Sequence, residues 1–236
     1  MENTALDADL LSLLKSVDTP TVCNAIEVAQ GKRGFQDFTR KTVIAADPTL
    51  GPIVGFARTA RISAVAPPTE PPEVIKQRRM AYYRYMASGD GPTIAVVEDA
   101  DDPHCVGAFW GEVNTTIHVG LGVSGVLTNG VLRDLGDLAP NFQVLAGSIG
   151  PSHGFVHVRD INEPVNVFGL RVHPGDLLHA DRHGAVVIPR EVISSLKNAI
   201  AKLHASEKLI LEPARQPGFT IERFEEAWRA FEAART

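Results

Sequence analysis

The first hydrophobic and polar positions of the chain recur with a helical period. Four leucines between positions 6 and 14 fall on one stripe, so an amphipathic helix is expected over residues 5–16. Thr19-Pro20 follows a capping aspartate, which predicts a second helix over residues 19–30. Residues 31–52 are rich in turn-forming and charged residues, and we expect an irregular surface segment there.

The period then shortens to two. Residues 53–66 alternate apolar with polar or small side chains and predict a long strand. A proline-rich run of six residues introduces a helix over 73–88, and a turn leads into a strand over 93–98. Helices and strands therefore alternate in this part of the chain.

Glycines punctuate the central stretch, residues 110–137. It is expected to contain a turn at 110–112, a helix over 113–119, a glycine corner at Gly120, Gly122 and Gly125, a strand over 126–128 and a second corner at Asn129-Gly130. Polar turns at the ends of apolar elements are where open α/β sheets place their ligand sites.

Short strands cluster after the central stretch, and helices end the chain. The strands are expected over residues 142–146, 156–158, 165–167, 177–179 and 185–188, and the helices over 191–211 and 221–234. The pattern predicts a single compact α/β domain over residues 1–236, with a core of about 15–190 and C-terminal helices of about 191–234. These helices carry more apolar positions than one small sheet absorbs, so we expect them to pack on neighbouring subunits.

Composition excludes several classes of partner. The net charge is -5 and there is no basic run, which argues against a nucleic-acid partner. No run of about 18 apolar residues occurs, so we expect no membrane partner. Cys23 and Cys105 show no metal or disulfide spacing, and the first residues are acidic where a signal peptide is basic, so a cytoplasmic protein is expected.

Arg133 and Asp134 form the central candidate for chemistry. Asp134 can hold a hard cation through oxygen, and Arg133 can bind a carbonyl or carboxylate with its planar guanidinium. Gly111 allows a close backbone approach before a helix whose first amides suit an anion. These residues predict a metal-assisted site for a small anionic acid.

A second constellation, His179, Asp181 and His183, could bind zinc if all three shared one face of a strand. Gly184 follows at once, so a hairpin tip is the preferred interpretation. Trp110 is expected to pack in the core rather than recognise a ligand. His153, in the loop 147–154, could contact substrate, although a loop histidine more often faces solvent.

Several motifs together resemble the RraA-like family, over roughly residues 15–210. They are Thr19-Pro20-Thr21-Val22-Cys23-Asn24-Ala25, Trp110-Gly111-Glu112, Gly122-Val123-Ser124-Gly125-Val126, Asn129-Gly130, Arg133-Asp134, Pro174-Gly175-Asp176, Ala180-Asp181, Gly184-Ala185-Val186-Val187 and Pro189. The family contains class II pyruvate aldolases, including 4-hydroxy-4-methyl-2-oxoglutarate aldolase, and a regulator of ribonuclease activity.

The resemblance implies a swivelling β/β/α-type mixed sheet, assembled as a homotrimer or dimer of trimers with sites between subunits. It assigns Asp134 to a divalent metal, Mg²⁺ or Mn²⁺, and Arg133 to the keto or carboxylate oxygens of the substrate. The substrate-holding turn would be Gly111, Glu112, Val113 and Asn114. Glu112 would also be the catalytic acidic residue, which takes the proton from the C4 hydroxyl. A further catalytic glutamate from a neighbouring subunit would be Glu207, with Glu212 as the runner-up.

Two positions depart from the family pattern. Asn129-Gly130 replaces the usual Asp-Gly, and we expect a turn role there. Residues 103–106 differ from the usual glycine-rich entry, which leaves the contacts to the distal part of the substrate open.

The expected function is a metal-dependent aldolase, a lyase that cleaves a 4-hydroxy-2-oxo acid such as 4-hydroxy-4-methyl-2-oxoglutarate to pyruvate and that also decarboxylates oxaloacetate. The alternative is a non-catalytic RraA-like regulator that binds a protein such as a ribonuclease. The regulator branch tends to lack the Arg-Asp pair, which this chain keeps. A methyltransferase is disfavoured because no glycine-rich nucleotide loop is present.

Overall fold

The computed structural model describes residues 6–89 and 91–235, and contacts divide the chain into two compact units. The first unit comprises the residues up to 19 together with 37–187, and the second comprises 20–36 together with the residues from 188 on. The expectation of one domain with C-terminal helices on neighbouring subunits remains a prediction.

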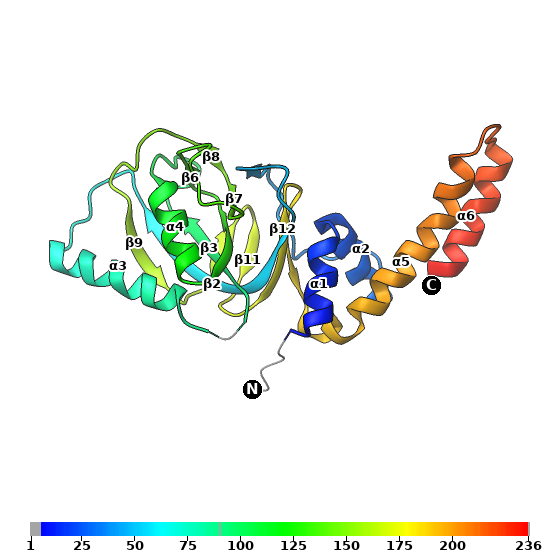
Figure 1. Ribbon diagram of the computed structural model, residues 1–236, viewed down its shortest axis with the longest axis horizontal. Helices are drawn as coiled ribbons and strands as arrows, with labels where there is room; N and C mark the ends of the chain where they lie inside the picture. Colours follow the sequence, from blue (N-terminus) through cyan, green and yellow to red (C-terminus); the bar gives the residue numbers. More distant parts are fainter. Residues whose placement is uncertain (1–5, 90, 236) are drawn as a thin grey trace. The chain divides into compact units, whose positions relative to one another are not determined.

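A mixed sheet forms the frame of the first unit (Figure 1). Its strand order is β1-β7-β5-β3-β2-β12-β13, and β9 also pairs with β2. The strands are β1 (Ile44–Ala45), β2 (Ile53–Ser63), β3 (Thr93–Asp99), β5 (Val123–Thr128), β7 (Gln143–Ala146), β9 (His157–Ile161), β12 (Leu177–Asp181) and β13 (Gly184–Ile188). β2, β3, β5 and β7 run parallel, whereas β1, β9 and β12 are antiparallel to their neighbours. The predicted mixed α/β fold with a curled sheet is confirmed.

The long strand β2 explains the curl. β12 pairs with its first residues, through Ile53 to Phe56, and β9 pairs with its last residues, through Ala60 to Ser63, with a register shift after Arg61. Two strands thus share one edge of β2, which bends across the unit (Figure 1). The strand predicted over 53–66 is present as Ile53–Ser63, but its side chains are buried or half-buried on both faces, so the alternation in the sequence is not an alternation of exposure.

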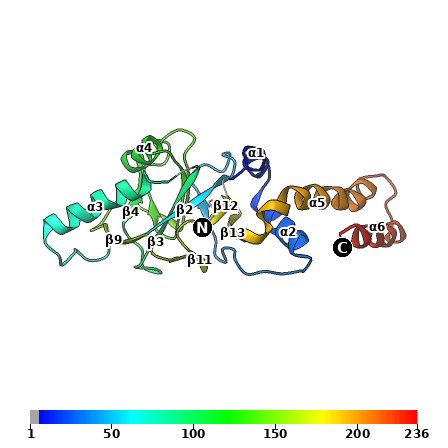
Figure 2. The same cartoon turned by 90° about the horizontal axis from the view of Figure 1, so that it is seen from below.

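Successive residues of β3 serve two separate cores. Ala95 and Val97 pack in a cluster with Tyr82 and Trp110, and Ile94 and Val96 pack in a cluster on the other face of the sheet. The helices of the first unit are α1 (Ala8–Ser16), α3 (Pro72–Met86) and α4 (Glu112–Gly120). α3 supplies Tyr82 and Met86 to the first cluster, and the hairpin of β10 (Val165–Val167) and β11 (Leu170–Val172) supplies four residues to the second. Figure 2 shows α4 and β11 on opposite sides of the sheet.

A small parallel sheet positions the central stretch. It has the order β4-β6-β8, formed by β4 (Ala108–Trp110), β6 (Val131–Leu132) and β8 (Ser148–Ile149). The sequence did not predict β1, β4, β6, β8 or β11, which are only two or three residues long and show little alternation of their own.

Gly125 corrects one expectation. It was predicted to form a corner, yet it lies inside β5 opposite Gln143 of β7. A Cβ at this position would come 2.7 Å from Ile53 Cγ2, so glycine here allows close packing rather than a turn. The turn itself is made by Gly122, which has a φ of 79°.

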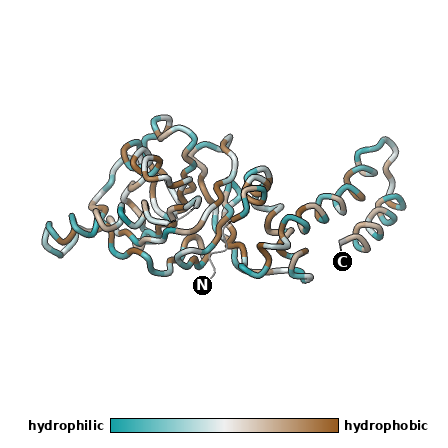
Figure 3. Tube along the Cα trace, turned by 60° about the horizontal axis from the view of Figure 1, so that its bottom comes forward, coloured by the Kyte–Doolittle hydropathy of each residue, from teal (hydrophilic) through white to brown (hydrophobic). Residues whose placement is uncertain are grey.

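The second unit is helical. It contains most of α2 (Thr19–Gln30), the 3-10 turn η1 (Arg190–Val192), α5 (Ile193–Ala214) and α6 (Ile221–Arg235). α5 and α6 pack as a hairpin, and the rings of Phe224, Trp228 and Phe231 on α6 contact one another in series at tilted angles. Hydrophilic and hydrophobic positions alternate along both helices (Figure 3), as expected of amphipathic helices. No helix within the described residues is long and apolar enough to cross a membrane.

Candidate functional site

Parallel pairing brings the two halves of the candidate site together. β4 pairs with β6 so that Trp110 lies opposite Leu132, and the Arg133 nitrogen donates a hydrogen bond to the Trp110 oxygen at 2.8 Å. The residues that follow each strand therefore emerge at the same edge. This is why Gly111, after β4, lies beside Arg133 and Asp134, after β6.

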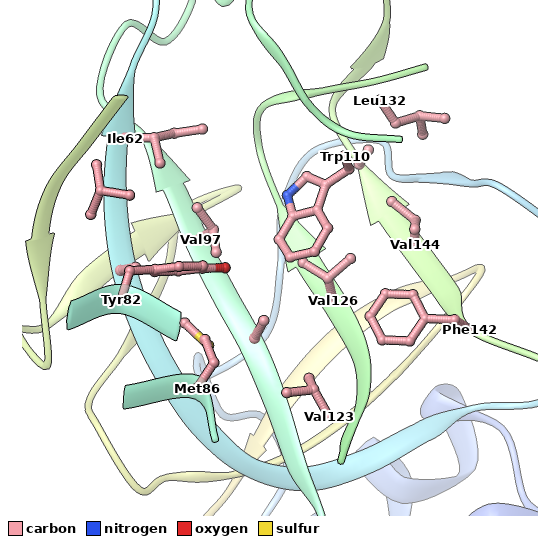
Figure 4. Packing of buried hydrophobic residues seen from close by; sticks show 14 of the residues in the cluster. Ile62, Tyr82, Met86, Val97, Trp110, Val123, Val126, Leu132, Phe142 and Val144 are labelled. Atoms are coloured by element: carbon pink, nitrogen blue, oxygen red, sulfur yellow. The ribbon is translucent and has the colours of Figure 1, made fainter. Parts of the chain in front are cut away.

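Trp110 fixes this edge to the core, as the sequence predicted. Its side chain is fully buried, and its ring lies 4.7 Å from the His118 ring and stacks on Phe142 at 6.4 Å. Figure 4 shows it among Tyr82, Val126 and Leu132. The end of β4, which leads into Gly111, is therefore fixed in place by the packing of Trp110 in the core.

Asp134 binds the start of α4. Its Oδ2 accepts a hydrogen bond from the Glu112 nitrogen at 3.1 Å and lies 3.7 Å from Arg133 Nε. Gly111 is the N-cap of α4 and has no side chain to offer, so Asp134 satisfies one amide of the first turn from outside the helix. Asp134 has a φ of 57°, a conformation that aspartate adopts more readily than most residues.

Gly111 is required for space. Its φ of -157° is extended, which any residue adopts, but a Cβ there would clash with Asp134 Oδ2 and come 3.0 Å from Arg133 Cγ. In this structure the groups that come close to the Gly111 backbone are the side chains of Arg133 and Asp134. The close approach of a ligand to Gly111 stays a prediction.

A pocket of about 470 Å³ opens beside this edge. Gly111, Val113, Asn114 and Arg133 line it, so three of the four residues of the predicted substrate-holding turn share this space with the predicted arginine. Glu112 and Asp134 are not among the lining residues. The size is in the range of small-molecule sites. The first-turn amides of Val113 and Asn114 have no carbonyl four residues earlier within α4, which leaves them suited to an anion.

The glutamates expected at the site lie in different units of the chain. Glu112 is the first residue of α4 and is exposed beside Asp134, with no side-chain hydrogen bond or ion pair among the described residues. Glu207 lies on α5 in the second unit, and so does Glu212. Within one chain the structure therefore brings together Gly111, Glu112, Arg133 and Asp134, and the role of Glu207 across subunits remains a prediction.

Asn129 takes the turn role expected of it. Its Oδ1 accepts from the Asp99 nitrogen at 2.7 Å, and its Nδ2 donates to the Asp99 oxygen at 3.0 Å. The amide thereby joins the end of β5 to the end of β3. Burial raises the pKa of the Asp99 carboxyl at the same point.

The alternative zinc constellation does not form a metal site. His179 is fully buried, with Nδ1 2.9 Å from Thr19 Oγ1 and Nε2 2.9 Å from the Leu14 oxygen. Asp181 Oδ2 accepts from the Thr19 nitrogen, and His183 follows in the turn between β12 and β13. No group of three or more His, Cys, Asp or Glu side chains in the described part of the chain could hold a metal ion by itself.

The sequence analysis missed three residues of α3 that line the pocket together with Arg133. Ile75, Arg79 and Tyr83 lie on α3 at intervals of four, which is one face of a helix. The helix was predicted, but nothing in its sequence indicates which face meets the central stretch. His153 and His157 also line the pocket, and His157 is buried.

Residues 19–187 match the RraA-like family, described as Aldolase/RraA. A putative 4-hydroxy-4-methyl-2-oxoglutarate aldolase of Halalkalibacterium halodurans is 26% identical over 212 residues, which are 86% of this chain and 90% of that protein. Protein DlpA of Legionella pneumophila is 26% identical over 137 residues, or 57% of this chain. An uncharacterized protein of Methanocaldococcus jannaschii is 33% identical over 107 residues, or 44% of this chain. The matched segments span only 22% and 51% of the last two relatives.

Solved structures show the same fold. An uncharacterized protein from Pseudomonas syringae pv. tomato superposes with a TM-score of 0.72 at 20% identity, and 97% of each chain is covered. RraAS2 of Streptomyces coelicolor, an unusual member of the RNase ES inhibitor RraA protein family, superposes with a TM-score of 0.64 at 22% identity, covering 89% of this chain and 98% of the other. At these identities the likeness concerns the fold alone.

Proposed function

The chain belongs to the RraA-like family, and from this membership and the geometry around Arg133 and Asp134 we propose that it is a divalent-metal-dependent lyase of 2-oxo acids. The family includes both aldolases and RraA regulators. The proposed reaction is the cleavage of a 4-hydroxy-2-oxo acid, such as 4-hydroxy-4-methyl-2-oxoglutarate, to pyruvate, with decarboxylation of oxaloacetate as a second activity. The observation that carries the proposal is that Arg133 lines a pocket beside a carboxylate, Asp134, and beside open helix amides.

The donor set fits Mg²⁺ or Mn²⁺. Asp134 is about one-third exposed, and its Oδ1 has no hydrogen-bond partner among the described residues. Mg²⁺ is commonly held by one or two carboxylates and keeps several waters, so a single protein oxygen suffices for this class of ion. When bound, such an ion supplies Lewis acidity to the oxygen on which an enolate develops.

Arg133 and the first turn of α4 orient the substrate in this proposal. The substrate carboxylate binds at the open amides of Val113 and Asn114, where the helix end favours negative charge. The guanidinium of Arg133 places a fixed positive charge at the developing oxyanion, a preorganised contribution of about 3 kcal/mol. Asp134 keeps that guanidinium in place through the contact at 3.7 Å.

Glu112 is the proposed proton acceptor for the C4 hydroxyl. It follows Gly111 directly and is exposed, so its carboxylate is free to take a proton from a substrate held by the same turn. Glu207 of a neighbouring subunit is proposed to complete the site, in a homotrimer or dimer of trimers.

The test is a coupled assay of pyruvate from oxaloacetate and from 4-hydroxy-4-methyl-2-oxoglutarate, with Mg²⁺ or Mn²⁺ and after chelation. Pyruvate release that needs the metal and is lost in Asp134→Ala and in Arg133→Lys supports the proposal. A metal blank without protein corrects for spontaneous decarboxylation. Release that does not exceed the blank rejects the proposal and favours a non-catalytic regulator that binds a protein such as a ribonuclease. Release that exceeds the blank but survives Asp134→Ala rejects the proposed metal-dependent mechanism at Asp134.

A further inference from the structure

One face of α3 forms a wall of the pocket that Arg133 also lines. Ile75, Arg79 and Tyr83 are spaced by four residues and all line the pocket, whereas Tyr82 and Met86 are buried in the core. The burial of Tyr82 and Met86 fixes the rotation of the helix, because a turn of α3 about its axis would expose them. The side of α3 on which Arg79 lies is therefore determined by the packing of Tyr82 and Met86 in the core.

The pocket has an excess of positive charge. Arg79 and Arg133 line it, and no acidic side chain of the described residues does, because Glu112 and Asp134 are not among its lining residues. Arg79 also has no ion pair in the described part of the chain, although its neighbour Arg78 is bound to Glu70 at 3.0 Å. An arginine without a carboxylate partner at a concave site is suited to binding a planar anion through two hydrogen bonds.

The wall between Arg79 and the α4 turn is held by hydrogen bonds. The Tyr83 hydroxyl donates to Asn114 Oδ1 at 3.1 Å, and Asn114 Nδ2 donates to the Phe109 oxygen at 3.0 Å. Burial raises the pKa of Tyr83, and the nearby positive charge of Arg79 opposes that rise. Arg79 and Tyr83 lie one helical turn apart and both line the pocket, and the Tyr83 hydroxyl is bound to the turn that is proposed to hold the substrate.

We infer that Arg79 binds a second carboxylate of the substrate, at the end remote from the 2-oxo group. The 2-oxo acid end lies at Arg133 and the α4 turn, an orientation that rests on the proposed function. The carbon skeleton then lies against the apolar side chains Ile75 and Val156, which also line the pocket. Arg79 is a specificity-determining residue in this arrangement, and it selects 2-oxo diacids over 2-oxo acids with a neutral tail.

Two unreactive acids isolate the contribution of the second carboxylate. 2-Oxoglutarate and 2-oxopentanoate have the same length and the same 2-oxo acid end, and differ only in the distal carboxylate. Titration calorimetry in the presence of Mg²⁺ measures their affinities without any turnover. The intact protein is expected to bind 2-oxoglutarate at least tenfold more tightly, the gain of a charge-assisted hydrogen bond.

Arg79→Gln is expected to reduce that preference to less than threefold and to leave the affinity for 2-oxopentanoate unchanged. Arg84→Gln is the matched control, because Arg84 is exposed on the same helix and does not line the pocket. It should keep the tenfold preference.

Equal affinity of the intact protein for the two acids, binding of neither, or an undiminished preference in Arg79→Gln overturns the inference. None of these results depends on pyruvate release. A protein that prefers the diacid through Arg79 but releases no pyruvate would reject the proposed lyase and retain the diacid site.

Discussion

The main-chain nitrogen of Glu112 donates a hydrogen bond to Asp134 Oδ2, over 3.1 Å. The carboxylate proposed to hold a metal therefore also caps the helix that carries the proposed substrate-holding turn. One side chain serves two tasks, and substitutions can separate them.

Asp134→Asn should retain the cap and lose the metal. The amide oxygen can still accept from the Glu112 nitrogen, and asparagine tolerates the φ of 57°. Asp134→Ala should lose both, at a cost of about 1 kcal/mol in the free energy of unfolding. Denaturant unfolding together with the pyruvate assay distinguishes the two. An Asn variant as unstable as the Ala variant would show that the cap contributes nothing.

Gly111→Ala should disrupt the edge of the small sheet. The added Cβ would clash with Asp134 Oδ2 and lie within 3.1 Å of Arg133 Nε, so at least one side chain must move. We expect a destabilisation of about 1 to 3 kcal/mol and a loss of pyruvate release of about 100-fold. Gly120→Ala is the control, because no atom lies within 4 Å of its Cβ position. Full activity in Gly111→Ala would contradict the assigned geometry.

Asn129→Asp restores the residue common in the family but should weaken this protein. The carboxylate cannot donate to the Asp99 oxygen and adds a charge beside a buried carboxyl. The expected cost is about 1 to 3 kcal/mol in denaturant unfolding, with no gain in activity. Asn162→Asp, at an exposed turn residue, is the control. A variant of higher activity and unchanged stability would show that this position acts at the metal.

His118 makes stability depend on pH. Burial lowers the pKa of His118 to about 4, below its ordinary value of 6.5, and its ring lies 2.7 Å from the Tyr82 hydroxyl. A depressed pKa means that the unfolded chain binds more protons, so stability is complete above about pH 6.5 and falls as the pH drops toward 4. Between pH 7.5 and 5 this residue accounts for roughly 2 kcal/mol.

Denaturant unfolding at both pH values measures the loss. Burial also lowers the pKa of His179, so some slope persists without His118. His118→Gln should reduce the slope, and the exposed His204→Gln should not. Equal slopes in the two variants would mean that His118 is protonated in the fold.

A site shared between subunits predicts complementation. Glu207→Gln should lower kcat at least tenfold and leave metal binding intact, whereas Glu212→Gln, on the same helix, should have little effect. Asp134→Ala and Glu207→Gln subunits are each expected to be inactive alone. Mixing them after denaturation should restore pyruvate release, because some sites then draw both intact residues from different chains. No recovery in refolded hetero-oligomers would place Glu207 outside the site.

Local chemistry explains how much the sequence predicted. The helices over 5–16, 19–30 and 73–88 and the strand over 53–66 are long enough for their periods to show, and each is present within a few residues. Arg133, Asp134 and Gly111 were identified because residue type and glycine spacing are properties of the chain itself. The grouping of Gly111 with Arg133 and Asp134 was expected from the polar turns at the ends of apolar elements and was also implied by the family resemblance, and the structure places the three residues together.

Only the tertiary structure determines which strands pair with one another and which face of a helix lies against the pocket. The strands β6 and β8 exist because neighbouring strands supply their hydrogen bonds, and two residues carry no period of their own. The same pairing joins Trp110 to Arg133 and thereby creates the site edge. Arg79 shows the limit most clearly: its sequence marks a polar position on a helix, and only the packing of Tyr82 and Met86 turns that position toward the pocket.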